Sequence, residues 1–189
     1  AAVYSFVVLI FGYTLVYSAA ILSLYTRKNT RVDASEWIEN NIPKGSSIAI
    51  ARSYFWTAPV LRQYNPPYKL IMGGDIQSVP DVYIPGLRGA AKKAEYVVLS
   101  EFEYRDYTHS KLKDLFPEQY KVFDEIMNGT GFKEAASFKR EAKFLGLTFK
   151  QDFPPGDWLI PNPKIIIYKR YAPPKAGKRD RAPSVSIPR

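Results

Sequence analysis

The amino-terminal stretch constrains the fold of this chain more than any other part. Residues 3–25 (VYSFVVLIFGYTLVYSAAILSLY) contain no charged side chain, and Arg27, Lys28 and Arg31 follow directly. As an α-helix this stretch is about 34 Å long, which is enough to cross a hydrocarbon core of about 30 Å. We therefore predict a transmembrane helix over residues 1–26, with the lipid bilayer as its partner.

Two other interpretations of this stretch fit its residues less well. A cleaved signal peptide begins with basic residues and has a shorter apolar centre, whereas this chain opens with Ala1-Ala2-Val3. A core helix of a soluble protein is rarely apolar all round over such a length. Because the chain has no initiator Met, we expect the end of a longer or processed protein, and other transmembrane helices as neighbours of this one.

Composition limits the chemistry of the rest of the chain. The remaining residues, about 160, suffice for one domain with a core, and 14 Tyr, 11 Phe and 3 Trp supply apolar area. The absence of Cys excludes disulfides, thiolate metal sites and cysteine nucleophiles. The single histidine, His109, argues against a histidine metal cluster or a His-based triad. We expect no metal and no cofactor.

The net charge of +9 is concentrated at the end of the chain. Seven Lys and Arg side chains against the single Asp180 lie in residues 169–189. Residues 172–189 are rich in Pro and Ala and have little to bury, which predicts a disordered basic tail or a strap over an acidic surface. Basic tails of membrane proteins often meet anionic headgroups, so we do not expect a nucleic-acid partner.

Between the apolar stretch and the tail, strand and helix patterns alternate. Strands are predicted at residues 47–51, 69–72, 96–100, 132–139 and 164–171, and helices at 34–41, from Thr57 to before Pro66, and at 117–128. This alternation predicts one α/β domain over residues 32–171, a layered fold with a mixed, partly parallel sheet and a hairpin-like antiparallel last pair. Residues 141–162 resist assignment because Gly and Pro interrupt them.

Several local details follow from the same patterns. Asp33 with Glu36 predicts a capping box in front of the first domain helix. Gly45 lacks the lysine and the spacing of a phosphate-binding loop, so it predicts a turn. The Pro and Gly residues after residue 79 predict a loop with one helical turn over residues 87–93. The strand at 132–139 is expected to place Phe132, Ala136 and Phe138 on one face.

Three motifs carry a resemblance to a known family. The apolar helix is followed by Trp-Ile-x-x-Asn-Ile-Pro-x-Gly-Ser at residues 37–46, by Tyr-Val-Val-Leu-Ser running into Phe-Glu-Tyr-Arg-Asp-Tyr at 96–107, and by Asn-Pro-Lys-Ile-Ile-Ile-Tyr-Lys-Arg at 162–170. In this order they resemble the C-terminal part of GT-C membrane glycosyltransferases, and especially the dolichyl-phosphate-mannose-protein mannosyltransferase-like family of prokaryotes. The resemblance covers about residues 1–171.

This resemblance implies a role next to catalysis rather than in it. In such enzymes the donor is a polyprenyl-phosphate-linked sugar, and the catalytic acid lies in the first extracytoplasmic loop, which this chain does not contain. The matching part would be the terminal extracytoplasmic domain, periplasmic or at the cell surface, that covers the membrane site or holds the acceptor. No catalytic residue is therefore assigned. The basic residues Arg27, Lys28 and Arg31 argue instead for a cytoplasmic domain, because basic residues that flank a transmembrane helix favour the cytoplasmic side.

The best candidate surface for binding directly follows the strand at 96–100. Glu101 and Glu103 offer carboxylates, Tyr104 and Tyr107 offer flat faces for a sugar, and Arg105 offers a fork for a phosphate. Ligands of open α/β sheets collect at the carboxyl ends of strands. The alternative is a solvated loop between strand and helix whose tyrosines cover the end of the sheet.

Two further alternatives stay open. Asn128-Gly129-Thr130 matches the N-glycosylation pattern, although Asn-Gly at the end of a helix also serves as a cap. For the whole chain, the alternative to a transferase domain is a non-catalytic, single-span accessory or structural subunit of a larger membrane protein complex. One predicted span, no catalytic loop and a basic, Pro-rich tail suit that interpretation.

Overall fold

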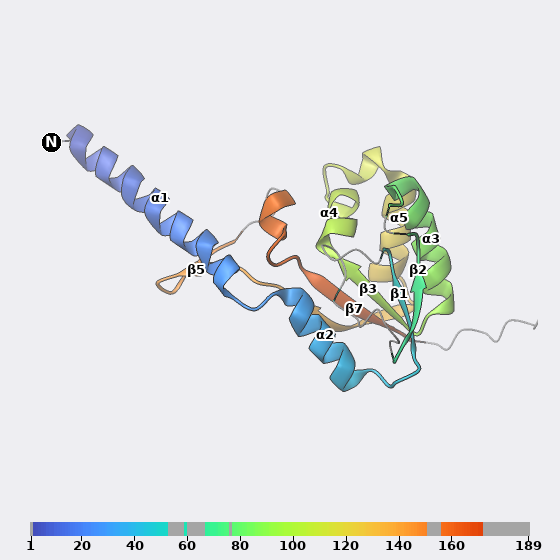
Figure 1. Ribbon diagram of the computed structural model, residues 1–189. Helices are drawn as coiled ribbons and strands as arrows, with labels where there is room; N and C mark the ends of the chain where they lie inside the picture. The colour runs from blue at the N-terminus through green and yellow to red at the C-terminus, as the bar shows by residue number, and fades with distance from the viewer. Residues whose placement is uncertain (1, 53–58, 60–66, 76, 151–155, 172–189) are drawn as a thin grey trace, which may run out of the picture.

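A computed structural model describes residues 2–52, 59, 67–75, 77–150 and 156–171 (Figure 1). In chain order the elements are α1 (Ala2–Thr26), α2 (Thr30–Asn41), β1 (Ser47–Ile50), β2 (Lys69–Met72), α3 (Pro80–Lys93), β3 (Tyr96–Ser100), α4 (Glu101–Thr108), η1 (Lys113–Leu115), α5 (Pro117–Met127), β4 (Phe132–Phe138), β5 (Ala142–Phe144), β6 (Leu147–Phe149), η2 (Gly156–Leu159) and β7 (Ile165–Arg170). The tail predicted at 172–189 lies outside the described residues, and so does almost all of the helix predicted after Thr57.

The domain is built on one five-stranded mixed sheet with the strand order β2-β1-β3-β7-β4. Strand β1 runs parallel to β2 and β3, whereas β7 runs antiparallel to β3 and β4. The predicted mixed α/β class is therefore confirmed, as is the antiparallel last pair. All five predicted strands form within about a residue of their expected bounds.

Helices cover both faces of the sheet and enclose two cores. On one face, α3, α4 and α5 pack against sheet residues that include Val97, Leu99 and Ile166. On the other face, α2 packs against Val98 and Ile167 among others. Neighbouring residues of a strand point to opposite faces, so the uninterrupted apolar runs of β3 and β7 feed both cores at once. The result is a three-layer domain with the sheet in the middle (Figure 1).

Helix α1 stands apart from the three layers (Figure 1). Its side chains are mostly exposed, and only its last third is covered by the rest of the chain. Among the described residues it is the one helix that is long and apolar enough to cross a membrane. A transmembrane helix and an amino-terminal signal sequence both fit these properties.

The predicted start of the first domain helix is wrong. Helix α2 begins at Thr30, four residues earlier than expected, because the side chain of Asn29 caps it by accepting the backbone N–H of Arg31 at 2.9 Å. Asp33 lies in the first turn instead, where its carboxylate pairs with Arg140 and with Lys28. An acid in the first turn suits the positive end of the helix dipole.

Residues 80–93 were expected to be mainly a loop, and this prediction is also wrong. They form the 14-residue helix α3, with Pro80 in its first turn and Pro85 inside it. Gly86 has a packing reason, because a Cβ atom there would overlap the backbone of Gly73 just after β2. The glycine thus lets the helix lie directly against the end of the strand.

Strand β4 contains a bulge that the alternation pattern did not reveal. Glu134 pairs with Tyr168 and Ala136 with Ile167, so Ala135 is an extra residue. A bulge shifts the alternation of side chains by one position. Phe132 therefore packs into the core under α3–α5, whereas Ala136 and Phe138 pack on the α2 face. The expectation that the three share one face is wrong.

A small hairpin, β5–β6, lies against α1 rather than joining the main sheet. Ala142 of β5 is buried against Ala20 and Leu24 of α1. The ring of Phe149 in β6 makes an edge contact with Tyr17, with the ring centroids 5.5 Å apart. This hairpin is the main covering of the last third of α1.

The buried amide of Asn162 joins α1 to the domain. Its Oδ1 accepts the backbone N–H of Thr30 at 3.1 Å, and its Nδ2 donates to the carbonyl oxygen of Leu24 at 2.5 Å. The hydroxyl of Thr30 in turn donates to the carbonyl of Pro163 at 2.6 Å. The end of α1, the start of α2 and the segment before β7 therefore meet at one side chain.

We expect Asn162→Ala to lower the free energy of unfolding by about 2 to 3 kcal/mol, because it leaves two buried backbone groups without partners. Urea unfolding in mild detergent measures this loss. The matched control is Asn41→Ala, since Asn41 donates to the carbonyl of Trp37 at 2.9 Å from an exposed position, and we expect a change of about 0.5 kcal/mol or less there. Equal losses of unfolding free energy in the two variants would contradict the role of Asn162 in joining α1 to the domain.

Candidate functional site

The best place for a ligand is the edge of the sheet where the parallel strands end. The chain runs from β1 to β2 on one side of it, whereas it runs from the neighbouring strand β3 to β4 on the opposite side of the sheet. Open α/β sheets bind their ligands at such a switch point, outside the carboxyl ends of the strands. We call the residues at the carboxyl ends of these strands, Ala51–Arg52, Gly73–Asp75 and Ser100–Glu101, the carboxyl edge.

Arg52 supplies a positive charge at the carboxyl edge. It lies two residues after the end of β1 and is partly buried. Its guanidinium lies over the ring of Tyr83, 4.3 Å from the centroid, and donates to the carbonyl of Ser78 at 3.1 Å. A guanidinium that is fixed on an aromatic face has already lost part of its conformational entropy. It can therefore bind an anion at a lower entropic cost.

Tyr83 and Tyr107 lie near this guanidinium, and Asp81 and Asp106 lie near Tyr107. Burial raises the pKa of the Tyr83 phenol, and Arg52 acts in the opposite direction. Burial, followed by the carboxylates of Asp106 and Asp81, raises the pKa of Tyr107 as well. Both phenols therefore keep their proton at neutral pH and remain hydrogen-bond donors. Asp81 and Asp106 are exposed; Asp81 accepts from Gln119 at 3.1 Å and Asp106 pairs with Arg105 at 3.0 Å. Because Tyr83 is buried, the cluster offers a ligand a cation, the ring of Tyr107 and the remaining acceptor positions of the carboxylates.

The residues predicted for binding occupy a helix and not a loop. Helix α4 begins at Glu101, and Glu103 closes its first turn by accepting the backbone N–H of Ser100 at 3.1 Å. The carboxylate of Glu101 accepts the backbone N–H of Lys164 at 2.9 Å. Both carboxylates thus hold the junction of β3, α4 and β7 together. The expectation of a solvated loop over residues 101–107 is wrong.

The other three predicted residues divide between packing and the carboxyl edge. Tyr104 is buried, and its ring makes an edge contact with Phe123 at a centroid distance of 6.5 Å. Arg105 pairs with Asp106 at 3.0 Å. Tyr107 stacks on Phe123 at 5.9 Å while its phenol lies near Arg52. The structure therefore brings Tyr107 to the cluster, whereas Tyr104 belongs to the core.

The two remaining sequence candidates lie at helix ends. His109 follows α4, and its Nδ1 accepts the backbone N–H of Lys111 at 3.3 Å. Asn128 caps α5, as the cap interpretation predicted, and it is exposed, with its amide donating to Asp124 at 2.8 Å. The glycosylation alternative at Asn128 remains a prediction. Within the described ranges, no group of three or more acidic or histidine side chains is placed to hold a metal ion.

The carboxyl edge lies close to the end of α1. Ser100 of β3 pairs with Ile165 of β7, three residues after Asn162, whose amide bonds the end of α1. Arg31, at the start of α2, places its guanidinium 5.9 Å from the ring centroid of Phe102 in α4. Burial lowers the pKa of Arg31 to about 10, so its guanidinium stays charged at neutral pH.

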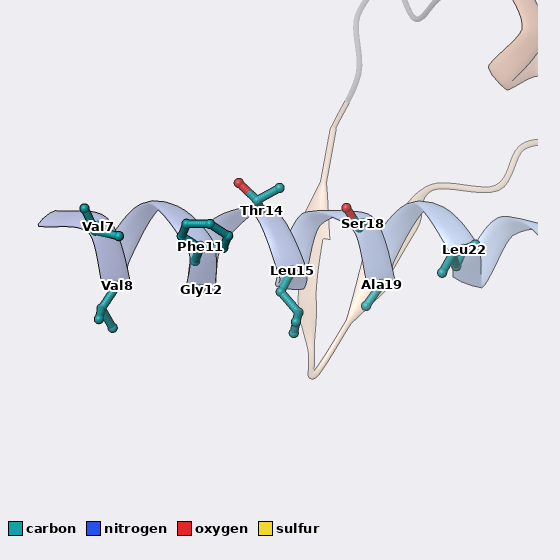
Figure 2. Close-up of a pocket in the computed structure, with 9 residues that line it drawn as sticks. All are labelled: Val7, Val8, Phe11, Gly12, Thr14, Leu15, Ser18, Ala19 and Leu22. Carbon is teal, nitrogen blue, oxygen red and sulfur yellow. The ribbon is translucent and has the colours of Figure 1, made fainter. Parts of the chain in front are cut away.

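A shallow apolar concavity runs along the side of α1 that the hairpin leaves open (Figure 2). It has a volume of about 790 Å³ and is lined by Val7, Val8, Phe11, Gly12, Thr14, Leu15, Ser18, Ala19 and Leu22. Gly12, Ser18 and Ala19 are small, so another helix or an acyl chain can approach the backbone of α1 closely there.

The sequence did not identify Arg52, Asp81 or Tyr83 as site residues. The signal that points to Arg52 is its position directly after a buried strand. Asp81 and Tyr83 were missed because residues 80–86 were expected to be a loop. Comparisons with protein-family models, with curated proteins and with solved structures found no match to this chain.

Proposed function

We propose that this chain is the membrane-anchored, extracytoplasmic domain of a polyprenyl-phosphate-sugar-dependent glycosyltransferase of the GT-C type. On this proposal α1 crosses the bilayer, and the carboxyl edge binds the acceptor or covers the membrane-embedded site. The chain contributes binding and shape, and the catalytic acid belongs to another part of the enzyme.

One observation carries the proposal, namely the position of the carboxyl edge beside the end of α1. The chain from Asn162 to Ile165 links the last turn of α1 to the end of β3 within a few residues. If α1 spans the bilayer, the edge of the sheet that suits a ligand then lies near the membrane surface. A lipid-linked sugar also has its phosphate and its sugar at the membrane surface.

The chemistry of the cluster at this edge suits such a substrate. Arg52 offers a fork of donors for a phosphate. Tyr107 is a protonated donor with a partly exposed ring that a sugar can contact, whereas Tyr83 is buried and holds the guanidinium of Arg52 in place. The exposed carboxylates of Asp81 and Asp106 accept hydrogen bonds from sugar hydroxyls. None of these roles requires a proton transfer to the substrate.

We expect Arg52→Gln to weaken the binding of a short polyprenyl-phosphate-linked mannose about tenfold or more, because charge-assisted hydrogen bonds contribute about 1.5 to 3 kcal/mol. Titration of farnesyl-phosphate mannose into the protein in nanodiscs, followed by intrinsic fluorescence, measures the affinity. The control is Arg88→Gln, since Arg88 pairs with Glu125 between α3 and α5 and should leave the affinity unchanged. Equal affinities of the wild type and Arg52→Gln would refute the role of the edge.

A second candidate function is a non-catalytic accessory subunit of a membrane complex. The open concavity of α1 with its small residues (Figure 2) favours it, because helices in membranes associate through such faces. Mass spectrometry of the protein purified in mild detergent separates the two proposals. Bound polyprenyl-phosphate lipid supports the transferase domain, whereas stoichiometric recovery of other membrane proteins without this lipid supports the subunit.

A further inference from the structure

The hairpin β5–β6 has an apolar face that extends past the helix it covers. Ala142 pairs with Phe149 and Phe144 with Leu147 across the two strands, and such cross-strand neighbours share a face. Ala142 is buried against α1, but Leu147 at the far end of this face is 57% exposed. In Figure 1 the loop of the hairpin projects beyond α1 on the side away from the three-layer domain.

The turn of this hairpin carries an apolar residue where a polar one would fit better. The two residues between the strands have positive φ angles, 49° at Leu145 and 80° at Gly146. Two-residue turns of this kind favour Asn or Asp before the glycine, because a larger side chain is strained in the left-handed region. Leu145 is nevertheless 81% exposed, so its side chain has little packing within the protein that could offset this strain. A strained, exposed leucine suggests an apolar environment that the protein alone does not supply.

The contacts with α1 fix the level at which the hairpin lies. It touches α1 between Tyr17 and Leu24, and the Ser23 hydroxyl accepts the backbone N–H of Lys143 at 3.4 Å. At 1.5 Å per residue this segment lies roughly 3 to 14 Å from the last residue of α1. If α1 spans the bilayer, the hairpin is therefore within one leaflet, near its headgroup boundary.

The polar groups of the hairpin are placed for the same boundary. Lys143, the middle residue of β5, lies on the face opposite the apolar one, and Lys139 and Lys150 flank the hairpin. All three lysines are exposed. Lysine stems can lie along apolar surface while their ammonium groups reach anionic headgroups. The outer edges of a two-stranded hairpin keep unpaired backbone groups, which excludes the dry centre of the bilayer but not its hydrated boundary.

We propose that the tip of the hairpin, Leu145–Leu147, inserts into the headgroup–acyl boundary of the leaflet that α1 enters from the domain side. The occupant of the exposed apolar tip is thus the lipid bilayer itself. The hairpin holds α1 from the side and fixes the height of the carboxyl edge above the membrane. This inference rests on the membrane anchor of the proposed function, but not on its substrate.

The absence of cysteine from the whole chain makes the test direct. Single variants Leu145→Cys and Leu147→Cys are labelled with an NBD maleimide in the full chain, reconstituted into nanodiscs of phosphatidylcholine and phosphatidylglycerol with or without a shallow doxyl-lipid quencher. Ile10→Cys, towards the middle of α1, is labelled in the same way and measured with a deep doxyl-lipid quencher, and it reports whether α1 is embedded. Lys44→Cys, in an exposed turn before β1, is the matched control outside the membrane. Circular dichroism verifies the fold of each variant.

We expect the quencher to reduce NBD emission at residues 145 and 147 at least threefold more than at residue 44, with a blue-shifted emission maximum. Quenching at residue 10 but not at 145 and 147 overturns the inference and leaves the membrane anchor intact. No quenching at residue 10 overturns the anchor itself, and the inference with it. The two failures are thus distinguishable in one set of samples.

Discussion

Replacing Gly86 by alanine is expected to destabilise the domain by about 3 kcal/mol, the upper end of the usual range for overpacked sites. A Cβ atom at residue 86 would overlap the carbonyl oxygen of Gly73. Both partners are backbone, so no side chain can rotate away. Helix α3 would have to move off the end of β2, which would also displace Tyr83 from Arg52. Urea unfolding in detergent measures the loss.

Helix α3 offers its own control for this prediction. Gly89 lies three residues further along, and a Cβ atom there would meet nothing within 4 Å. Gly89→Ala should therefore stabilise the protein by about 0.5 to 1 kcal/mol, the difference in helix propensity between the two residues. Opposite signs at residues 86 and 89 are the expected result. A loss at both positions would mean that the close approach of α3 to β2 is not what determines the effect.

Phe123→Ala is expected to cost about 3 to 5 kcal/mol, as large aromatic truncations in cores do. The side chain is fully buried in α5, where it stacks on Tyr107 and makes an edge contact with Tyr104. Its removal leaves a cavity beneath α4. The unfolding midpoint of the variant in urea, compared with that of the wild type, gives the magnitude.

The same substitution connects packing to the candidate site. Without Phe123, the ring of Tyr107 loses the surface on which it stacks, so we expect the affinity for farnesyl-phosphate mannose to fall together with stability. Phe116→Ala is the control, because Phe116 also contacts Tyr107, at 5.4 Å, but is 39% exposed. Its stability loss should be less than half as large. Comparable losses in both variants would contradict a core centred on Phe123.

The sheet could be predicted from the sequence because its strands coincide with short apolar runs that lie between turn residues. Tyr96–Ser100 and Ile165–Arg170 are such runs, and each matches a strand almost residue for residue. Their order with intervening helices was enough to predict a mixed sheet with an antiparallel last pair. The apolar stretch at the start likewise forms one long helix, α1.

The helices were harder to predict because residues that are typical of turns and loops lie inside them. Pro85 and Gly86 are typical helix breakers, yet α3 contains both, since the burial of Tyr83, Ile84 and Leu87 outweighs the propensity cost. The charged residues 101–107 were expected to be a loop. The signal for a helix there was Ser100 followed three residues later by Glu103, the pattern of a capping box.

Most of the candidate site depends on topology, which no local pattern reveals. Arg52, Tyr83 and Tyr107 are far apart in sequence and come together only because β1 and β3 are neighbours and α3 and α4 lie on one face of the sheet. Sequence reasoning chose the right strand end and one of these three residues, Tyr107. It also assigned binding roles to Glu101 and Glu103, which the structure uses to hold the start of α4 in place.

The strand order also governs when this domain can form during synthesis. Strand β7 is the last described strand in sequence, yet it lies inside the sheet, and β4 pairs with it and with no other described strand. While residues 165–170 are still in the ribosome, β3 and β4 have open edges. The nascent chain would therefore need protection from aggregation until residues 165–170 emerge.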